Sequence, residues 1–413
     1  MTEVNDASEV VDLLTPRSEV ILIESAEQVS TMLADLRRGT GALAVDAERA
    51  SGFRYSQAAF LLQLHRRGSA IYLIDPQATF TDEESRFNVA AFMTEMPWIL
   101  HASTQDLPCL NELGLRPTAL IDTELGSRIL GLPRVGLGAV VEHFLGFKLA
   151  KEHSAVDWST RPLPADWLDY AALDVDVLPE LAEALQAALE EAGKWVYAQQ
   201  EFAHLTGFRP KEKQPDRWRG TTGAHEIKSQ RGLAVVRELW NAREALAMKL
   251  DVSPGRLVPD ASISAVAKIL PRSKSELASE RSFHGRASRT YLDTWWTALQ
   301  TGLATHDLPP LKVTHTGIPN HRSWPNRYPD AEARLKAVKP VISSLVEELS
   351  IPAENLLTPD YLRSLCWHFN EWSEQQVDEH LASLGARSWQ REKLVTALCE
   401  ALHSAGAGER SLN

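Results

Sequence analysis

A short apolar segment that ends in two carboxylates places the strongest constraint on the fold of this chain. Residues 43–48 have the sequence LAVDAE, which predicts a buried β-strand with Asp46 and Glu48 at its end. Residues i and i+2 of a strand face the same side, so both carboxylates point to one place. Two such groups repel each other unless a cation lies between them. Hard divalent cations such as Mg²⁺ take oxygen ligands and also bind phosphate, so the segment predicts metal-dependent phosphoryl chemistry.

The length of 413 residues exceeds what one ordinary hydrophobic core supports, and two or three domains are expected. No apolar run is long enough to span a bilayer, and residues 1–17 are polar and acidic without a signal-peptide pattern. Cys109, Cys366 and Cys399 are far apart in sequence and lack the spacing of metal ligands. We therefore expect a reduced, cytoplasmic setting.

Alternating strand-like and helix-like patterns predict a mixed α/β domain over residues 16–204. Helical patterns cover 26–36, 106–113 and most of 122–202. Strand-like segments are 20–23, 43–46, 58–64, 70–74 and 98–101, and the third and fourth of them should pair as an antiparallel hairpin.

The remainder of the chain is predicted to be helical, with two interruptions. A basic linker is expected at 205–228, a helical domain at 229–306, a second linker at 307–330 and a second helical domain at 331–405. Residues 351–359 (IPAENLLTP) echo residues 252–260 (VSPGRLVPD). The echo suggests two copies of one small helical unit.

The formal net charge of −12 argues against a nucleic-acid partner, but the charge is uneven along the chain. An acidic stretch from 166 to 191 is followed by two basic clusters. Their members are Arg209, Lys211, Lys213, Arg217, Arg219, Lys228, Arg231, Arg237, Arg243, Lys249, Lys268, Arg272, Lys274, Arg281, Arg286 and Arg289. An acidic metal centre beside a basic groove suits a phosphodiester enzyme, whereas solvated helix faces would produce the same pattern without this function.

Two further segments carry groups of the kind that a metal centre needs. Asp106 begins a helix after the strand at 98–101, where capping the helix is the simpler role. Tyr170 and Asp174 have the i, i+4 spacing that stacks them on one helix face, although a solvated aspartate beside a packed tyrosine fits equally. His101 is expected to be a core histidine, and Asp122 to cap the helix that follows it.

Taken together, Asp46-x-Glu48, Asp106 and Tyr170-x-x-x-Asp174 resemble the DEDD superfamily of 3′–5′ exonucleases, in its tyrosine subclass. Residues 122–125 (DTEL), 156–163 (VDWSTRPL) and 169–175 (DYAALDV) look like ribonuclease D. Residues 239–244 (LWNARE) and 257–260 (LVPD) look like the HRDC domain, a helical module that RecQ-type helicases share with ribonuclease D. The resemblance implies an α/β ribonuclease H-like exonuclease domain followed by all-α HRDC helical domains.

The resemblance also implies roles for the five motif residues. Asp46, Glu48 and Asp174 would hold the Mg²⁺ or Mn²⁺ ion that activates the attacking water. Asp46 would bridge to a second ion, with Asp106 helping through water. Tyr170 would orient the attacking water, because the ordinary pKa of a tyrosine is too high for a general base.

Substrate-binding residues are predicted with less support from the pattern. Arg49 stands where the family usually has an apolar or aromatic residue, and Phe53 and Tyr55 are expected to hold the terminal base in its place. Arg161 would contact either a phosphate or a carboxylate, and Arg243 is a candidate in the basic cluster. Five tryptophans of the helical part are expected to be core residues rather than base-stacking platforms: Trp295, Trp296, Trp367, Trp372 and Trp389.

The predicted function is a metal-dependent 3′–5′ exoribonuclease that acts on RNA 3′ ends, tRNA precursors included, and releases nucleoside monophosphates. One alternative is an enzyme with the same chemistry that acts on DNA, a DNA 3′–5′ exonuclease, because no segment clearly recognises a 2′-hydroxyl group. The other alternative is not an enzyme but a catalytically inactive nucleic-acid-binding scaffold. The five converging polar residues argue against a scaffold. The helical domains would bind nucleic acid or protein, and a monomer is expected.

Overall fold

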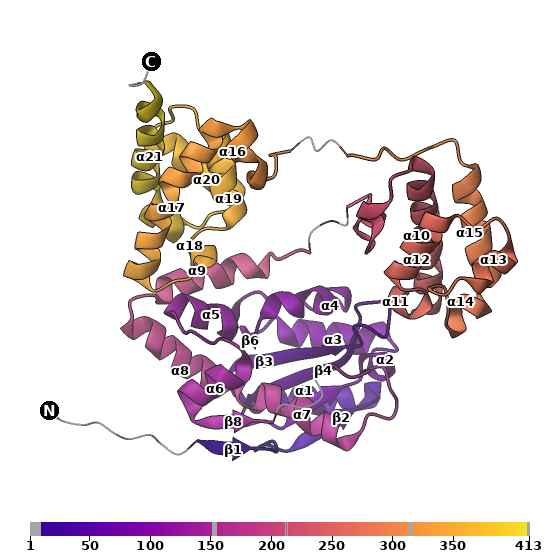
Figure 1. Ribbon diagram of the computed structural model, residues 1–413. Coiled ribbons are helices and arrows are strands. Elements are labelled where there is room, and N and C mark those ends of the chain that lie inside the picture. Colours follow the sequence, from indigo (N-terminus) through magenta and orange to yellow (C-terminus); the bar gives the residue numbers. More distant parts are fainter. Residues whose placement is uncertain (1–9, 151–154, 211, 213, 314–316, 411–413) are drawn as a thin grey trace.

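The computed structural model describes residues 10–150, 155–210, 212, 214–313 and 317–410. It comprises an α/β domain and two all-helical domains, which lie apart from each other along the α/β domain (Figure 1). Lys211 and Lys213 of the predicted basic cluster lie outside the described residues. Within the described ranges, no helix is long and apolar enough to cross a membrane.

A six-stranded mixed sheet with the order β2-β5-β4-β3-β6-β7 forms the centre of the α/β domain. Strand β4 runs antiparallel to both of its neighbours, while the other pairings are parallel. The predicted hairpin is thereby confirmed, and the arrangement is the expected ribonuclease H-like one. The strands are β2 (Val20–Ile23), β3 (Thr40–Arg49), β4 (Ala59–Arg67), β5 (Ile71–Ile74), β6 (Trp98–Leu100) and β7 (Leu120–Asp122).

Helices cover both faces of this sheet, and successive residues of β3 enter the two cores alternately. Leu43 and Val45 belong to one core, whereas Ala44 belongs to the other. The helical elements are η1 (Ala26–Gln28), α1 (Val29–Arg38), α2 (Pro76–Thr79), α3 (Glu83–Met93), η2 (Ser103–Gln105), α4 (Leu107–Glu112), α5 (Thr123–Leu130), α6 (Leu137–Leu145), α7 (Ala165–Asp176), α8 (Leu178–Glu191) and α9 (Trp195–Thr206). A second, two-stranded sheet that the sequence patterns did not predict pairs β1 (Val11–Leu13) with β8 (Phe147–Leu149).

The first helical domain begins earlier than the sequence predicts. Trp218, Ala224 and Ile227 are buried in its core, so the second half of the predicted linker at 205–228 belongs to the domain. Its composition of glycine and charged residues hides these three apolar anchors. The elements are η3 (Arg217–Gly220), η4 (Ala224–Glu226), α10 (Gln230–Leu250), α11 (Pro254–Leu257), α12 (Asp260–Ile269), α13 (Lys274–Ser279), α14 (Arg286–Thr290) and α15 (Leu292–Ala304).

The second helical domain also extends into its predicted linker, because Trp324 is fully buried in its core. Its elements are η5 (His321–Ser323), α16 (Trp324–Arg327), α17 (Pro329–Leu349), α18 (Ala353–Leu356), α19 (Pro359–His368), α20 (Glu374–Leu384) and α21 (Ser388–Arg410). The five tryptophans expected in cores are all buried in, or packed against, hydrophobic cores.

The echo between the two helical domains has a structural counterpart. Helices α10 and α17 each have 21 residues, and each ends at a left-handed residue, Asp251 or Ser350. A four-residue helix, α11 or α18, follows in both domains. The two segments therefore build the same long-helix, short-helix unit.

Candidate active site

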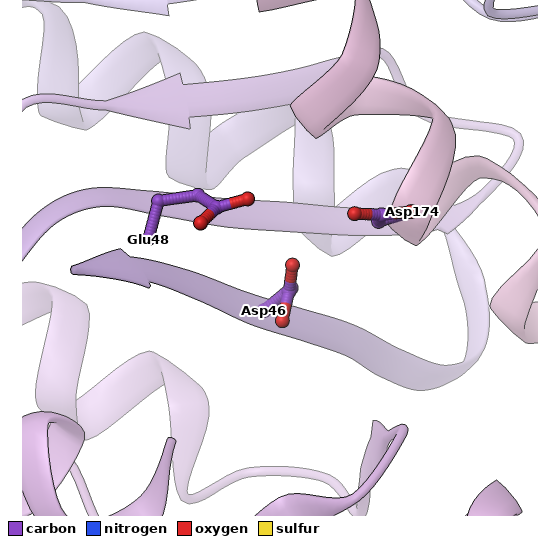
Figure 2. Close-up of side chains that lie close together, drawn as sticks. All are labelled: Asp46, Glu48 and Asp174. Carbon is purple, nitrogen blue, oxygen red and sulfur yellow. The ribbon is translucent and has the colours of Figure 1, made fainter. Parts of the chain in front are cut away.

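Three carboxylates from two distant segments converge at one point of the α/β domain. Asp46 and Glu48 lie on β3, and Asp174 lies on α7. One carboxylate oxygen of each lies within 4.8 Å of one oxygen of each of the others. Figure 2 shows the three side chains pointing toward a common space. The predicted convergence on one face of the strand is thus present.

Helix α7 brings Asp174 to this point because its apolar face packs on the same side of the sheet. Ala171, Ala172 and Val175 are fully buried in the core that also contains Ala44. One turn before Asp174, Tyr170 lies close enough to the Asp174 carboxylate for each group to shift the pKa of the other. The i, i+4 pair predicted from sequence is therefore an interacting pair at the cavity, rather than a solvated aspartate beside a packed tyrosine.

Asp106 occupies the N-cap position of α4 but does not act as a cap. Its side chain makes no cap hydrogen bond to the helix. The residue is buried, and its carboxyl group lies close enough to Asp46 for the charge of Asp46 to raise its pKa. The simpler role that the sequence allowed for this residue is excluded, and Asp106 joins the acidic cluster as its fourth member.

Burial and mutual repulsion disfavour the charged forms of these acids. Burial raises the pKa of Asp46 to about 6. Burial, followed by the charges of Asp46, Asp174 and Asp106, raises the pKa of Glu48 to about 10. The pKa values of Asp106 and Asp174 are also raised well above the usual range, chiefly by burial.

Such a cluster is costly to ionise unless a cation compensates it. Carboxylate oxygens are the ligands that hard divalent ions prefer, and three of these carboxylates can offer oxygens to a single ion. The donor set therefore fits the divalent metal that a 3′–5′ exonuclease domain is expected to use.

All five predicted catalytic residues line one cavity of about 430 Å³. Its lining also includes Arg49 at the end of β3, Ser51 just after the strand, and Gln105. Tyr170 faces this space with its pKa raised, first by burial and then by the neighbouring acids, so its hydroxyl keeps its proton.

His101 and Asp122 behave as structural residues, as expected. Burial lowers the pKa of His101, and its Nδ1 atom lies 2.9 Å from the Thr123 hydroxyl. The Asp122 carboxylate caps α5 by accepting a hydrogen bond from the Leu125 amide at 3.0 Å. His101 nevertheless reaches the cavity wall, where it is held neutral.

Two arginines predicted to bind substrate are instead committed to the fold. The Nε atom of Arg161 lies 2.5 Å from Asp75 Oδ2, and its other nitrogens donate to backbone carbonyls, including that of Phe60 at 2.8 Å. Of the two roles open to Arg161, the structure shows the carboxylate contact. Arg243 is buried and donates to Asp260 Oδ1 at 2.7 Å and to the Val258 carbonyl at 2.9 Å. Neither guanidinium lines the cavity, because each is held by partners elsewhere in the fold.

Phe53 and Tyr55, predicted to hold the terminal base, face the first helical domain rather than the cavity. The guanidinium of Arg256 lies over the Phe53 ring, 4.1 Å from its centroid. The Tyr55 hydroxyl donates to Glu244 Oε2 at 3.3 Å. The geometry therefore corrects the prediction: the two aromatic residues form an interdomain contact.

Gln63 is a site residue that the sequence patterns did not single out. It lies opposite Asp46 in the pairing of β3 with β4, and it is completely buried. Its Nε2 atom donates to Asp46 Oδ2 at 3.4 Å, and this contact orients the carboxylate. The available signal was an amide in the middle of the apolar segment 59–64, since a buried polar side chain needs a partner.

Many cations of the predicted basic clusters are paired within their own domain. Arg237 lies 2.8 Å from Asp307, and Lys268 lies 2.5 Å from Glu226. Lys274 forms an ion pair with Asp293. The first helical domain therefore presents less free positive charge than the count of its basic residues implies.

Comparisons with known proteins agree with the geometry. A family model described as 3′-5′ exonuclease matches residues 20–190, a model described as HRDC domain matches 232–299, and a model described as 3′ to 5′ exonuclease C-terminal domain matches 317–402. Ribonuclease D of Cronobacter turicensis is 29% identical over 89% of this chain and 95% of its own length. The chain is therefore similar to ribonuclease D over most of its length. The expected exonuclease domain and the first expected HRDC domain are thereby confirmed, whereas the segment expected to be a second HRDC-like domain matches the exonuclease C-terminal model instead.

Solved structures show the same relationship. The crystal structure of Escherichia coli RNase D, whose title describes an exoribonuclease involved in structured RNA processing, is 25% identical. It covers 94% of this chain and 99% of its own, with a TM-score of 0.66. A protein from Bifidobacterium adolescentis is 38% identical over 96% of this chain and 100% of its own, with a TM-score of 0.86. The likeness to ribonuclease D thus covers the helical domains as well as the α/β domain.

Proposed function

We propose that the protein is a metal-dependent exoribonuclease that trims RNA 3′ ends, tRNA precursors included, and releases nucleoside monophosphates. The observation that carries the proposal is the convergence of Asp46, Glu48 and Asp174 in one cavity, with Asp106 and Tyr170 beside them. Similarity to ribonuclease D over most of the chain supports the direction and the substrate class.

The acidic residues divide into two overlapping ligand sets. Asp46, Glu48 and Asp174 would hold one Mg²⁺ or Mn²⁺ ion, and Asp46 with Asp106 would hold the second. Two such ions, when bound, lower the pKa of the attacking water and stabilise the leaving 3′ oxygen. The hydrogen bond from Gln63 would hold the Asp46 carboxylate in one orientation, which suits a ligand that both metal sites share.

Tyr170 orients the attacking water and does not remove its proton. The raised pKa keeps the hydroxyl protonated at neutral pH, so it is a hydrogen-bond donor and a poor base. Its interaction with Asp174 places it beside one metal ligand, in the lining of the cavity. We expect the hydroxyl to contribute to turnover more than to substrate affinity.

A matched assay tests the proposal and its alternatives. Single-stranded RNA and DNA of the same sequence, each with a free 3′ hydroxyl, are incubated with Mg²⁺, Mn²⁺ or chelator, and products are resolved by length. Stepwise loss of mononucleotides from RNA, absent with chelator, is expected. Preferential digestion of DNA would establish the DNA exonuclease alternative, and no digestion of either strand would favour the inactive scaffold.

We further propose a cytoplasmic, monomeric protein whose helical domains contribute to nucleic-acid binding. The three buried free thiols, Cys109, Cys366 and Cys399, are compatible with a reducing compartment. Sedimentation of the protein at micromolar concentration tests the monomer, and localisation of a tagged chain tests the compartment.

A further inference from the structure

Arg49 is the last residue of β3, and it reaches the cavity because the strand pairing is irregular there. The pairing with β4 steps from Glu48 opposite Leu61 to Arg49 opposite Ala59, so one residue of β4 is skipped. Bulges of this kind re-aim the neighbouring side chains away from strict alternation. Arg49 therefore lines the same cavity as Glu48, although adjacent residues of a regular strand face opposite sides.

The guanidinium of Arg49 is available for a ligand. Within the described parts of the chain it makes no ion pair and no hydrogen bond, and it is only half-buried. It lies close enough to Asp46, Glu48 and Asp106 for its positive charge to offset part of the rise that burial causes in the pKa of each carboxyl group. Among the described residues that line the cavity, it is the one side chain with a permanent positive charge.

The charge of Arg49 matches what a phosphodiester brings. Four carboxylates, those of Asp46, Glu48, Asp106 and Asp174, balance two divalent cations. Arg49 then leaves the loaded cavity with one net positive charge, equal and opposite to the charge of a phosphodiester group. Without Arg49 the loaded cavity would be neutral and would attract the anionic end of a strand less strongly.

Resting on the proposed function, we propose that Arg49 binds a phosphate group of the 3′-terminal nucleotides and sets the affinity of the cavity for the strand end. A guanidinium donates two parallel hydrogen bonds to phosphate oxygens, which fixes orientation as well as adding affinity. Phe53 and Tyr55 face the first helical domain, so Arg49 holds the strand end through its phosphate rather than through its terminal base. It recognises the backbone, so it favours no particular base.

The test compares AMP with adenosine as ligands of the full-length protein in Mg²⁺ by isothermal titration calorimetry. The two share base and sugar, but only AMP carries a phosphate. In Arg49→Gln, loss of the charge-assisted hydrogen bonds should weaken AMP binding about ten- to hundredfold, while adenosine changes less than about twofold. Arg49→Lys keeps the charge without the planar fork and should lie between. Arg67→Gln is the matched control, because Arg67 lies opposite Thr40 at the far end of β3.

An exonuclease assay on the same proteins separates this inference from the proposed function. We expect Arg49→Gln to raise KM more than it lowers kcat. Wild-type protein that digests no 3′ end would overturn the proposed function itself. If the wild type is active but Arg49→Gln binds AMP with unchanged affinity, only the assignment of Arg49 is overturned. The assignment also fails if Arg49→Gln weakens AMP and adenosine equally, because that result indicates that Arg49 stacks on the base. If circular dichroism shows that Arg49→Gln is unfolded, Arg49→Lys decides the question, and wild-type affinity for AMP in that variant sinks the assignment.

Discussion

The two helical domains share a structural unit, but they attach to the α/β domain in different ways. The first holds the loop that follows the catalytic strand, largely through backbone groups at the surface. The Ser253 amide donates to the Phe53 carbonyl at 2.9 Å, and Arg256 Nε donates to the Gly52 carbonyl at 2.8 Å. Asp251 accepts a hydrogen bond from the Ser56 amide at 2.8 Å. This loop continues directly from Arg49 and Ser51, which line the cavity.

The second helical domain shares a hydrophobic core with the α/β domain. Trp389 belongs to that core and stacks on Tyr197, with 4.7 Å between ring centroids. Glu201 on α9 is buried and accepts hydrogen bonds from Arg387 at 2.7 Å and from the Trp389 indole at 2.9 Å. Gly131 is needed at the contact, because a Cβ atom there would lie 2.3 Å from the Ser350 carbonyl oxygen.

The two modes of attachment suggest that the helical domains have different tasks. The first interface consists mostly of partly exposed polar contacts, with Tyr55 packed against the edge of the helical core, so it contributes less to the free energy of unfolding than a shared core does. Its position places the first domain to shape the loop beside the cavity. A buried, fully paired cluster inside a core is costly to break, so the second domain is part of what keeps the α/β domain folded. Deleting the second domain would expose the apolar side of α9, and point variants therefore separate these tasks more cleanly than truncation.

The largest effect is expected in the carboxylate cluster, which lies outside both interfaces. Asp46→Asn or Asp174→Asn should lower kcat/KM by at least about a thousandfold in Mg²⁺, since each removes a charged metal ligand. Folding should be retained, because neutralising one acid relieves repulsion among the others. Steady-state digestion of a labelled RNA measures the loss, with Glu183→Gln as an exposed control on α8. Full activity of Asp46→Asn in Mg²⁺ would show that the carboxylate cluster is not the catalytic metal site.

Breaking the second interface should affect stability and spare catalysis. Glu201→Ala leaves Arg387 buried without its carboxylate, which should cost about 3 kcal/mol or more of unfolding free energy. Glu95→Ala, which removes an exposed pair with Arg37, should cost less than about 1 kcal/mol. Denaturant unfolding measures both, and kcat/KM of the folded fraction should stay within about twofold. A loss of activity without a loss of stability in Glu201→Ala would reverse the division of tasks between the two domains.

Removing the metal should reveal how the acidic site contributes to the free energy of unfolding, separately from the two interdomain interfaces. The pKa of Asp46 is raised to about 6 and that of Glu48 to about 10 in the folded protein, above the values near 4 of unfolded chains. The folded state therefore binds more protons at these two groups, and their contribution to stability is fully present below about pH 4 and is lost as pH rises through the folded pKa values.

Thermal unfolding of chelated protein at pH 5, 6, 7 and 8 tests this dependence. The melting temperature of the chelated protein should fall from pH 5 to pH 8 relative to that of the same protein in Mg²⁺. The increase in melting temperature that Mg²⁺ produces should therefore be largest at pH 8. Asp46→Asn should flatten the dependence, whereas Glu201→Ala should lower all points together. An Mg²⁺ gain that does not change with pH would contradict the proposed coupling between metal and carboxylates.

The smallest effect is expected at the first interface. Arg256→Ala removes the contact with the Phe53 ring and the Gly52 carbonyl, so the loop after β3 should become less well held. We expect kcat/KM to fall about three- to tenfold, with unfolding free energy lowered by less than about 1 kcal/mol because Arg256 is exposed. Lys268→Ala, in the same domain but away from the loop, is the control. Unchanged kinetics in Arg256→Ala would show that the first domain does not influence the cavity through this contact.

Much of the site was predictable because its chemistry follows from local spacing. The i, i+2 rule for a strand placed Asp46 and Glu48 together, and the i, i+4 rule for a helix placed Tyr170 against Asp174. The order and spacing of these short motifs also identified the family, which the comparisons confirm. The hairpin and most helices followed from periodicity for the same reason, since each depends on neighbours in sequence.

Contacts between distant segments were decided only by the tertiary structure. The sequence left Asp106 with two roles, and its orientation toward Asp46 depends on how β6 and α4 pack beside β3. Arg161 and Arg243 carried the right charge for a substrate contact, but their partners, Asp75 and Asp260, come from other elements. Arg49 shows the opposite case, because a bulge against β4 turned it into the cavity. Residue type and spacing therefore determined which chemistry is present, whereas packing determined which charged groups remain free to take part in it.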